Sequence, residues 1–356
     1  MKLSIHNKPA LYGLQKSNRD FTKEKSWGKN IFNNAFPIAL ACYMDTRAIE
    51  PIYLQFDKDM ALSHATIPVA TLFGKKPDDE TTFFAFESDF VPYRSLVIGN
   101  LPRADIVIQD EKSGQCTSGL EIKLTALPDN STYKLGDERF GCELVIRPDT
   151  IVYLALSIAR EFKHKPRTLQ SQLEMISHIS DWTDIAEVAP YIPQMARVLD
   201  DLLQSNLHLQ RPLVLQPVWK TIGRTLQLHS DAFDIFVWSD FAFTRLFFRD
   251  AHNIKGKPSR SARSIAWLAK MLLDFAANGK IDHHWVVDNM SFNTKNDKAF
   301  AVNGRVTQPY MACTELEEPR IKKDEIRHII LHGGQNFLSP ERRLDAALLS
   351  TLGLFD

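Results

Sequence analysis

The chain has 356 residues, of which 44% are hydrophobic and 24% are charged, the composition of an ordinary globular protein. Its 43 basic and 43 acidic residues give a formal net charge of zero. The molecule as a whole therefore has no electrostatic attraction to nucleic acid, and binding to it would require a local basic surface. The sequence has no signal peptide and no run of about 18 apolar residues, so we expect a cytoplasmic protein without membrane segments.

The first half of the chain predicts a helix followed by a sheet. An apolar run from Trp27 to Met44 predicts a helix that Pro37 interrupts or begins. Short β-rich runs follow, separated by Asp, Gly, Pro and Ser, and they predict strands over residues 52–56, 65–73, 81–87, 104–110 and 119–127.

The second half of the chain contains both helix-like and strand-like hydrophobic patterns. Helical patterns cover residues 149–162, 169–179, 194–204 and 263–279, and strand-like runs cover residues 213–219 and 233–239. Asn303-Gly304 predicts a hairpin turn, and Ser339-Pro340 predicts the start of a last helix. We therefore expect a mixed α/β protein whose central sheet has helices on both sides.

The domain organisation follows from the same patterns. We expect a core over residues 1–165 and a mixed, largely helical region over residues 166–356. No linker separates the two regions, so one continuous domain remains an alternative.

The sharpest chemical pattern is Asp105 followed, after 15 intervening residues, by Glu121-Ile122-Lys123. If residues 104–110 and 119–127 form an antiparallel hairpin that turns near Ser113-Gly114, Asp105 lies opposite residue 121, 122 or 123. Because strand side chains alternate, Glu121 and Lys123 then share one face while Ile122 points into the apolar layer.

Two carboxylates beside a lysine suit the hydrolysis of a phosphodiester. Mg²⁺ prefers oxygen ligands, so Asp105 and Glu121, helped by the carbonyl oxygen of Ile122, are the predicted metal ligands. Lys123 would orient or help to deprotonate the attacking water. This is the pattern of a PD-(D/E)xK nuclease, although Glu-x-Lys is also common on the solvated face of an antiparallel sheet.

Longer blocks of sequence resemble a known family, the HindVP-like type II restriction endonucleases. The blocks are SNRD (17–20), WGKNIFNNAFPIALACYM (27–44), PRADIVIQ (102–109), LEIKLTALPDNST (120–132), VIRPDTIVYLA (145–155) and QPVWKTIG with FDIFVWSD (216–240). Asp105, Glu121 and Lys123 match the family's catalytic motif position by position. Ala104 stands where the name of the motif has proline, a replacement that is frequent in such enzymes.

The resemblance implies a restriction-endonuclease-like fold and a Mg²⁺-dependent homodimer that cuts both strands of double-stranded DNA. Residues 1–165 would then form the nuclease core, and residues 166–356 would supply DNA contacts and the dimer interface. It also implies a short palindromic site, of which GRCGYC is an example in the family, and a cognate DNA methyltransferase that protects host DNA. Two alternatives remain open: a structure-specific nuclease of repair or recombination, and a non-catalytic DNA-binding protein on the same fold.

Other residues are weaker candidates. Residues 251–273 contain no acidic residue and open with a loop that leads into a helix. Their basic residues include four candidate DNA contacts, Lys255, Lys257, Arg260 and Arg263. Asn30 is a further candidate, because asparagine can read adenine. Glu87 and Asp89 could add a carboxylate to the metal site. A solvated loop and ordinary strand ends are the corresponding structural explanations.

Overall fold

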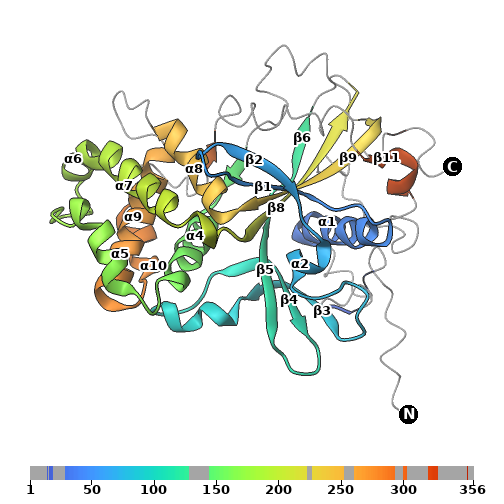
Figure 1. Ribbon diagram of the computed structural model, residues 1–356, viewed down its shortest axis with the longest axis horizontal. Helices are drawn as coiled ribbons and strands as arrows, with labels where there is room; N and C mark the ends of the chain where they lie inside the picture. The colour runs from blue at the N-terminus through green and yellow to red at the C-terminus, as the bar shows by residue number, and fades with distance from the viewer. Residues whose placement is uncertain are drawn as a thin grey trace.

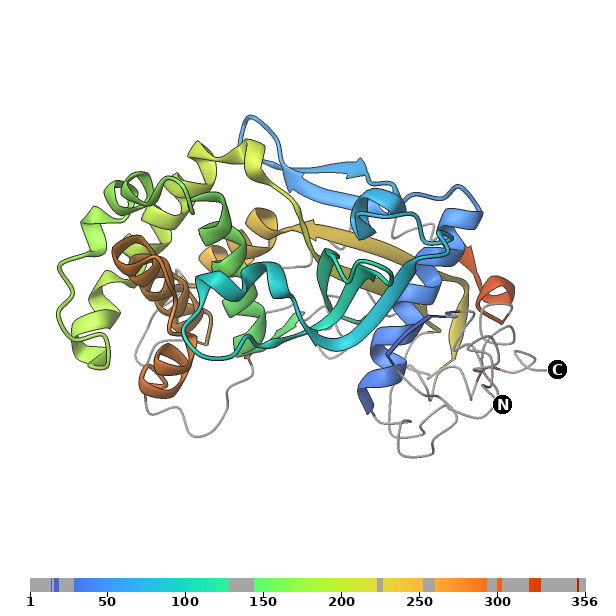
Figure 2. The same cartoon turned by 90° about the horizontal axis from the view of Figure 1, so that it is seen from below.

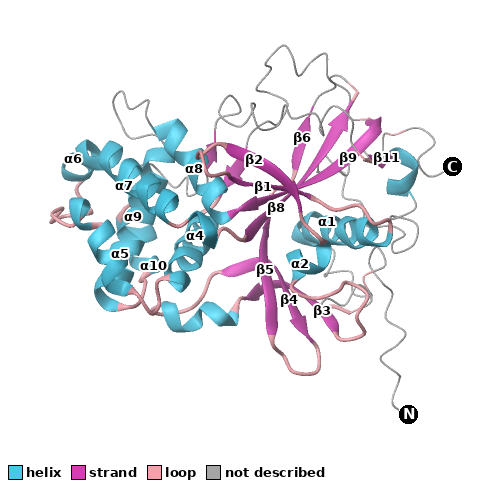
Figure 3. Cartoon of the chain, in the orientation of Figure 1, coloured by secondary structure: helices cyan, strands magenta, loops and turns pink. Residues whose placement is uncertain are grey.

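The computed structural model describes residues 14, 16–18, 29–127, 144–222, 227–251, 260–292, 300–302, 320–327 and 351. Figures 1 and 3 show a twisted sheet with most helices, α4 to α10, gathered at one end, while α1 and α2 lie beside the other end. This arrangement confirms the expected mixed α/β class with helices flanking a central sheet.

The described strands form one nine-stranded mixed sheet and one small two-stranded sheet. The main order is β2-β1-β9-β8-β5-β4-β3, with β6 also pairing with β8 and β11 with β9. The strands are β1 (Ile52–Phe56), β2 (Leu62–Thr66), β3 (Thr82–Asp89), β4 (Arg103–Asp110), β5 (Cys116–Ile122), β6 (Thr125–Leu127), β7 (Leu144–Ile146), β8 (Pro212–Thr221), β9 (Leu228–Ser239), β10 (Phe300–Val302) and β11 (Ile321–Lys322). β10 and β7 form the small sheet.

The described α-helices vary from one turn to five turns. They are α1 (Lys29–Thr46), α2 (Val69–Phe73), α4 (Pro148–Glu161), α5 (Pro166–Gln172), α6 (Ile185–Val188), α7 (Ile192–Ser205), α8 (Asp240–Ala251), α9 (Arg260–Asn278) and α10 (His283–Asn289). Short 3₁₀ segments are η3 (Val91–Leu96), η5 (Glu174–Ile176), η6 (Ala189–Tyr191) and η7 (Leu207–Leu209).

The sheet separates two hydrophobic cores because its strand residues alternate between faces. On β9, Phe236 and Trp238 pack in the core that α4, α7 and α9 cover. Ile235 and Val237, on the opposite face, pack in the core that α1 and α2 cover. Each fully buried side chain of this size contributes about 1.5–3 kcal/mol relative to its exposed state. Both faces of the central strands are thus apolar.

Two of the predicted strands need correction. Residues 65–73 were expected to form one strand, but pairing ends near Thr66 and residues 69–73 form α2. Pro68 has no N–H for the ladder, and its φ of −58° suits a helix start. The expected strand over residues 119–127 divides into β5 and β6, with Lys123 at the break.

The long helices of the sequence prediction are present, whereas α6, α8 and α10 were not predicted. The helix from Trp27 to Met44 corresponds to α1, with Pro37 inside it. The helix α8 was not foreseen, since FAFTRLFF has no clear polar face. The sequence nevertheless holds a signal for the start of α8. The Ser239 hydroxyl accepts a hydrogen bond from Ala242 N at 3.0 Å, as an N-cap residue does. Asn303-Gly304 and Ser339-Pro340 lie outside the described residues.

The two regions proposed from the sequence share the central sheet. β8 and β9, from the region after residue 165, lie between β1 and β5 from the region before it. β8 pairs in parallel with β5 through Glu121↔Val214 and Ile122↔Leu215. The division at residue 165 stays a prediction, but the strand that carries Glu121 depends on residues from both sides of it.

Gly74, at the end of α2, lets the helix pack closely against Thr117 on β5. Its φ of +67° ends α2, and a Cβ there would lie 3.0 Å from Thr117 O on β5. We expect Gly74→Ala to lower the free energy of unfolding by about 1–2 kcal/mol for the left-handed conformation, with a further loss from the contact.

Gly114→Ala is the matched control in thermal unfolding. Gly114 has a φ of +70°, but a Cβ there would meet nothing within 4 Å. If the two variants unfold at the same temperature, close packing of α2 on β5 contributes nothing to stability.

Candidate active site

The β4–β5 hairpin confirms the register expected from the sequence. Its pairs include Ile106↔Leu120 and Val107↔Gly119, so continuation of the ladder would place Asp105 opposite Glu121. The turn is close to the expected place, with Gly114 N donating to Asp110 O at 2.8 Å. Two carboxylates that lie far apart in sequence are thus brought onto neighbouring strands.

The regular pairing of β4 with β5 ends next to Asp105, after the pair Ile106↔Leu120. Ala104 packs in the core under α4, whereas Ile106 packs in the core under α1, although residues two apart on a regular strand share a face. Glu87, on the neighbouring strand β3, has a left-handed φ of 46°. At this irregularity the Asp105 side chain takes over a backbone role: its Oδ2 accepts a hydrogen bond from Ile122 N at 2.8 Å.

Glu121 and Lys123 complete the group. Their side chains are only 6% and 10% exposed, and Lys123 Nζ lies 3.2 Å from Glu121 Oε2. Burial, followed by the negative charge of Asp105, raises the pKa of Glu121 to about 8 despite the opposing influence of Lys123. Ile122, between them, packs in the core under α1, as expected.

The donor set fits a divalent cation that prefers oxygen. Glu121 Oε1 is buried and has no hydrogen-bond partner among the described residues, which is costly for a carboxylate unless a cation completes its environment. A cation between Asp105 and Glu121 would also relieve the repulsion that raises the Glu121 pKa. Within the described ranges, no three His, Cys, Asp or Glu side chains gather as a metal site, so this would be a two-carboxylate site that leaves places for water and phosphate.

Asp149 is a nearby acid that the sequence reasoning missed. It lies in the first turn of α4, and burial raises its pKa. Lys123 lowers and Asp105 raises that pKa, so Asp149 lies within electrostatic range of both. After burial, His283 has the largest effect on the Asp149 pKa and lowers it. His283 Nε2 donates a hydrogen bond to Asn100 O at 2.7 Å. The Arg-Pro-Asp sequence that begins α4 was the available signal.

Tyr153 fixes the segments that lead into this site. The residue is 2% exposed on α4, and its hydroxyl donates to Pro102 O at 2.6 Å, just before β4. The same hydroxyl accepts a hydrogen bond from Phe90 N at 3.4 Å, just after β3. Phe90 in turn packs so tightly over Gly119 that a Cβ there would lie 3.0 Å from the ring. One side chain therefore joins the end of β3 to the start of the strand that carries Asp105.

The additional acidic candidates lie beside the site. Glu87 is half-buried on β3 at the level of Asp105, between the pairs Phe86↔Ile106 and Ser88↔Ala104. Asp89 is exposed at the end of β3 and pairs with Arg103 in the register. No described contact joins either carboxylate to Glu121, so a metal-binding role for them stays a prediction.

The predicted DNA contacts are only partly placed. Lys255 and Lys257 lie outside the described residues, as do the side chains of Arg260 and Asn30. Arg263 is 3% exposed, and its guanidinium carbon lies 5.1 Å from the centre of the Trp267 ring. Most of the Arg263 side chain is therefore packed against described residues, and its role as a DNA contact stays a prediction.

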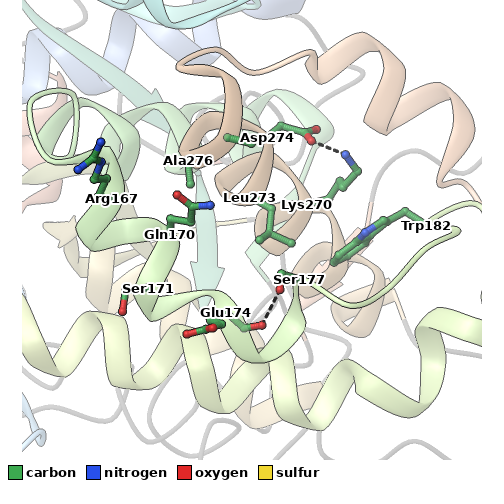
Figure 4. A pocket seen from close by; sticks show the side chains of 11 residues that line it. Arg167, Gln170, Ser171, Glu174, Ser177, Trp182, Lys270, Leu273, Asp274 and Ala276 are labelled. Atoms are coloured by element: carbon green, nitrogen blue, oxygen red, sulfur yellow. Dashed lines mark hydrogen bonds and ion pairs between the residues drawn. The ribbon is translucent and has the colours of Figure 1, made fainter.

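A hollow of about 590 Å³ lies away from the carboxylates, between α5, η5 and α9 (Figure 4). Lys270 and Asp274 form an ion pair at its edge, and Ser177 donates to Glu174 O at 2.7 Å. None of its lining residues belongs to β4 or β5. The hollow therefore has no part in the chemistry of the candidate site.

Comparison with known proteins gives concordant results over nearly the whole chain. The model of the HindVP restriction endonuclease family matches residues 27–355. The type II restriction enzyme HgiDI of Herpetosiphon aurantiacus is 48% identical over 352 residues, which cover 98% of each chain. The probable type II restriction enzyme HindVP of Haemophilus influenzae is 40% identical over 357 residues, covering 99% of this chain and 97% of the relative.

Two negative findings accompany these matches. No solved structure matches the chain significantly. Among the helices that the structure describes, none is both long and apolar enough to cross a bilayer.

Tyr153→Phe tests the connection between α4 and the strand that carries Asp105. The substitution keeps the packed ring but leaves the buried Pro102 carbonyl and Phe90 N–H without this partner. We expect the free energy of unfolding to fall by about 1–3 kcal/mol, measured by urea denaturation.

Tyr53→Phe is the control for loss of a buried hydroxyl. Tyr53 Oη is buried but has no hydrogen-bond partner in the described part of the chain, so its removal should be neutral or stabilising. Equal effects of the two substitutions would contradict the bridging role of Tyr153.

Proposed function

The chain belongs to the HindVP restriction endonuclease family and is therefore a DNA-cleaving hydrolase, and we propose that it is a type II site-specific deoxyribonuclease that depends on Mg²⁺. The observation that carries this proposal is the meeting of Asp105, Glu121 and Lys123 at the end of the β4–β5 ladder. The family match gives the class of reaction, and the geometry supports the proposal that these three residues perform it.

Asp105 and Glu121 would hold the divalent cation, with the carbonyl oxygen of Ile122 as a further ligand. When bound, Mg²⁺ supplies positive charge that activates the attacking water and stabilises the charge that develops on the phosphate. Asp105 is suited to its role because the hydrogen bond from Ile122 N fixes one of its oxygens. Glu121 is suited to its role because its Oε1 is buried without another described partner.

Lys123 would act on the attacking water. Its Nζ is held 3.2 Å from Glu121 Oε2, so the ammonium group stays beside the carboxylates instead of extending into solvent. From this position the Nζ–H groups can orient the water towards phosphorus and lower the cost of losing its proton. The N–H of Lys123 donates to Leu215 O at 3.0 Å, which fixes its backbone on β8.

We extend the proposal to the DNA and to the assembly. The proposed DNA contacts remain Lys255, Lys257, Arg260, Arg263 and Asn30, and Glu87 and Asp89 remain proposed supporting acids. A palindromic duplex has two scissile bonds related by a two-fold axis, which favours a homodimer. We propose a short palindromic site, with GRCGYC as a candidate, and a cytoplasmic enzyme that works with a cognate DNA methyltransferase.

Incubation of the purified protein with plasmid DNA tests the proposed function. In Mg²⁺ we expect discrete fragments whose ends map to one short palindromic sequence, and in EDTA we expect none, because the carboxylate pair alone cannot supply the missing positive charge. Cutting that is confined to branched DNA would indicate a structure-specific nuclease instead. Tight binding without cleavage would indicate a non-catalytic DNA-binding protein.

Lys123→Ala tests the assignment of the catalytic lysine. We expect single-turnover cleavage to slow by roughly 10²–10⁴-fold, because water loses its positioned partner, while specific DNA binding is retained in a gel-shift assay. Asp105→Ala should also remove the response to Mg²⁺.

Lys75→Ala is the matched control for the loss of a half-buried lysine. The Lys75 side chain is 13% exposed and pairs with Asp110 on β4, at the opposite end of the strand from Asp105. This variant should cleave DNA at the rate of the unaltered protein. Full activity of Lys123→Ala would refute the assigned role.

A further inference from the structure

Asn34 is a polar residue on the inner face of the first helix. It is 5% exposed, and its helix neighbours Ala35, Phe36 and Ile38 are completely buried in the core between α1 and the sheet. A buried amide must find hydrogen-bond partners or destabilise the fold. Figures 1 and 2 both show α1 beside the part of the sheet that contains β4 and β5.

The partner of Asn34 is Asp105. Asn34 Nδ2 lies 3.4 Å from Asp105 Oδ1 and 3.4 Å from the Asp105 backbone oxygen. Both of these atoms accept hydrogen bonds, so the amide nitrogen, and not the amide oxygen, must face them. On the other side, Asp105 Oδ2 accepts from Ile122 N. Each oxygen of this carboxylate therefore has one donor from the protein.

We propose that Asn34 is a positioning residue that sets the orientation of the Asp105 carboxylate for cation binding, an inference that rests on the proposed metal-dependent function. A carboxylate has about four lone-pair sites, and the two donors leave the others for the cation. The bond from Ile122 N holds only Oδ2, and an ionised Glu121 repels the Asp105 carboxylate. A neutral amide opposes rotation of that carboxylate without adding charge to the site.

Asn34→Leu tests this role, because leucine has a similar size and suits an apolar helix face but donates no hydrogen bond. Binding of Mn²⁺ to the DNA-free protein is measured by electron paramagnetic resonance, and the Mg²⁺ concentration for half-maximal cleavage is measured in parallel. We expect both to weaken by about 10–100-fold, the usual effect of removing a group that orients a metal ligand. DNA binding without divalent cations should not change.

Asn206→Leu is the matched control. Asn206 is also buried, at 9% exposure, and its Nδ2 donates to Leu202 O at 2.8 Å near the end of α7. The same substitution there should lower the unfolding temperature but leave Mn²⁺ binding unchanged. Asn34→Ala serves as a second variant if the leucine is too bulky for the protein to fold.

The outcomes separate this inference from the proposed function. If the unaltered protein binds Mn²⁺ and both Asn34 variants bind it equally well, Asn34 has only a structural role and the inference fails. If the unaltered protein neither binds Mn²⁺ nor requires Mg²⁺ for cleavage, the proposed metal-dependent function fails first.

Discussion

The hydrogen bond from Ile122 N to Asp105 Oδ2 is the interaction on which the candidate site depends. Up to Ile106↔Leu120, main-chain groups join β4 to β5. At Asp105, the next residue towards the start of β4, the side-chain carboxylate replaces a main-chain oxygen as the acceptor for Ile122 N. The site therefore begins where the ladder ends. The carboxylate stays next to Glu121 because leaving would expose a buried N–H without a partner.

Elements from distant parts of the chain maintain this position. Tyr153 on α4 joins the segment that follows β3 to the segment that precedes β4. Asn34 on α1 contacts Asp105 from the opposite face of the sheet. β8 pairs with β5 at Glu121, although about 90 residues separate the two strands in the sequence. The position of one carboxylate is thus determined by both hydrophobic cores, and a rigid scaffold of this kind is what precise phosphate chemistry requires.

The candidate catalytic carboxylates could be predicted from the sequence, but the residues that hold them in position could not. Strand periodicity and a turn at Gly114 were sufficient to place Asp105 opposite Glu121, because hairpin register is a local property. Asn34 and Tyr153 could not be assigned in this way, since their contacts with Asp105 and Pro102 span 71 and 51 residues. The burial of Arg263 was not foreseen for a related reason: charge predicts exposure, but the Trp267 ring and Ser291 O give its guanidinium a buried place.

The same geometry that suits catalysis opposes stability. Glu121 is buried beside Asp105, its Oε1 has no hydrogen-bond partner within the described residues, and its pKa is raised to about 8. A fold selected for stability alone would place an apolar side chain there, as on the neighbouring positions Leu120 and Ile122. The protein keeps two carboxylates and offsets their cost with apolar packing on both faces of the sheet. Divalent cations should therefore act as ligands of the folded state, so that their binding stabilises the protein as well as enabling cleavage.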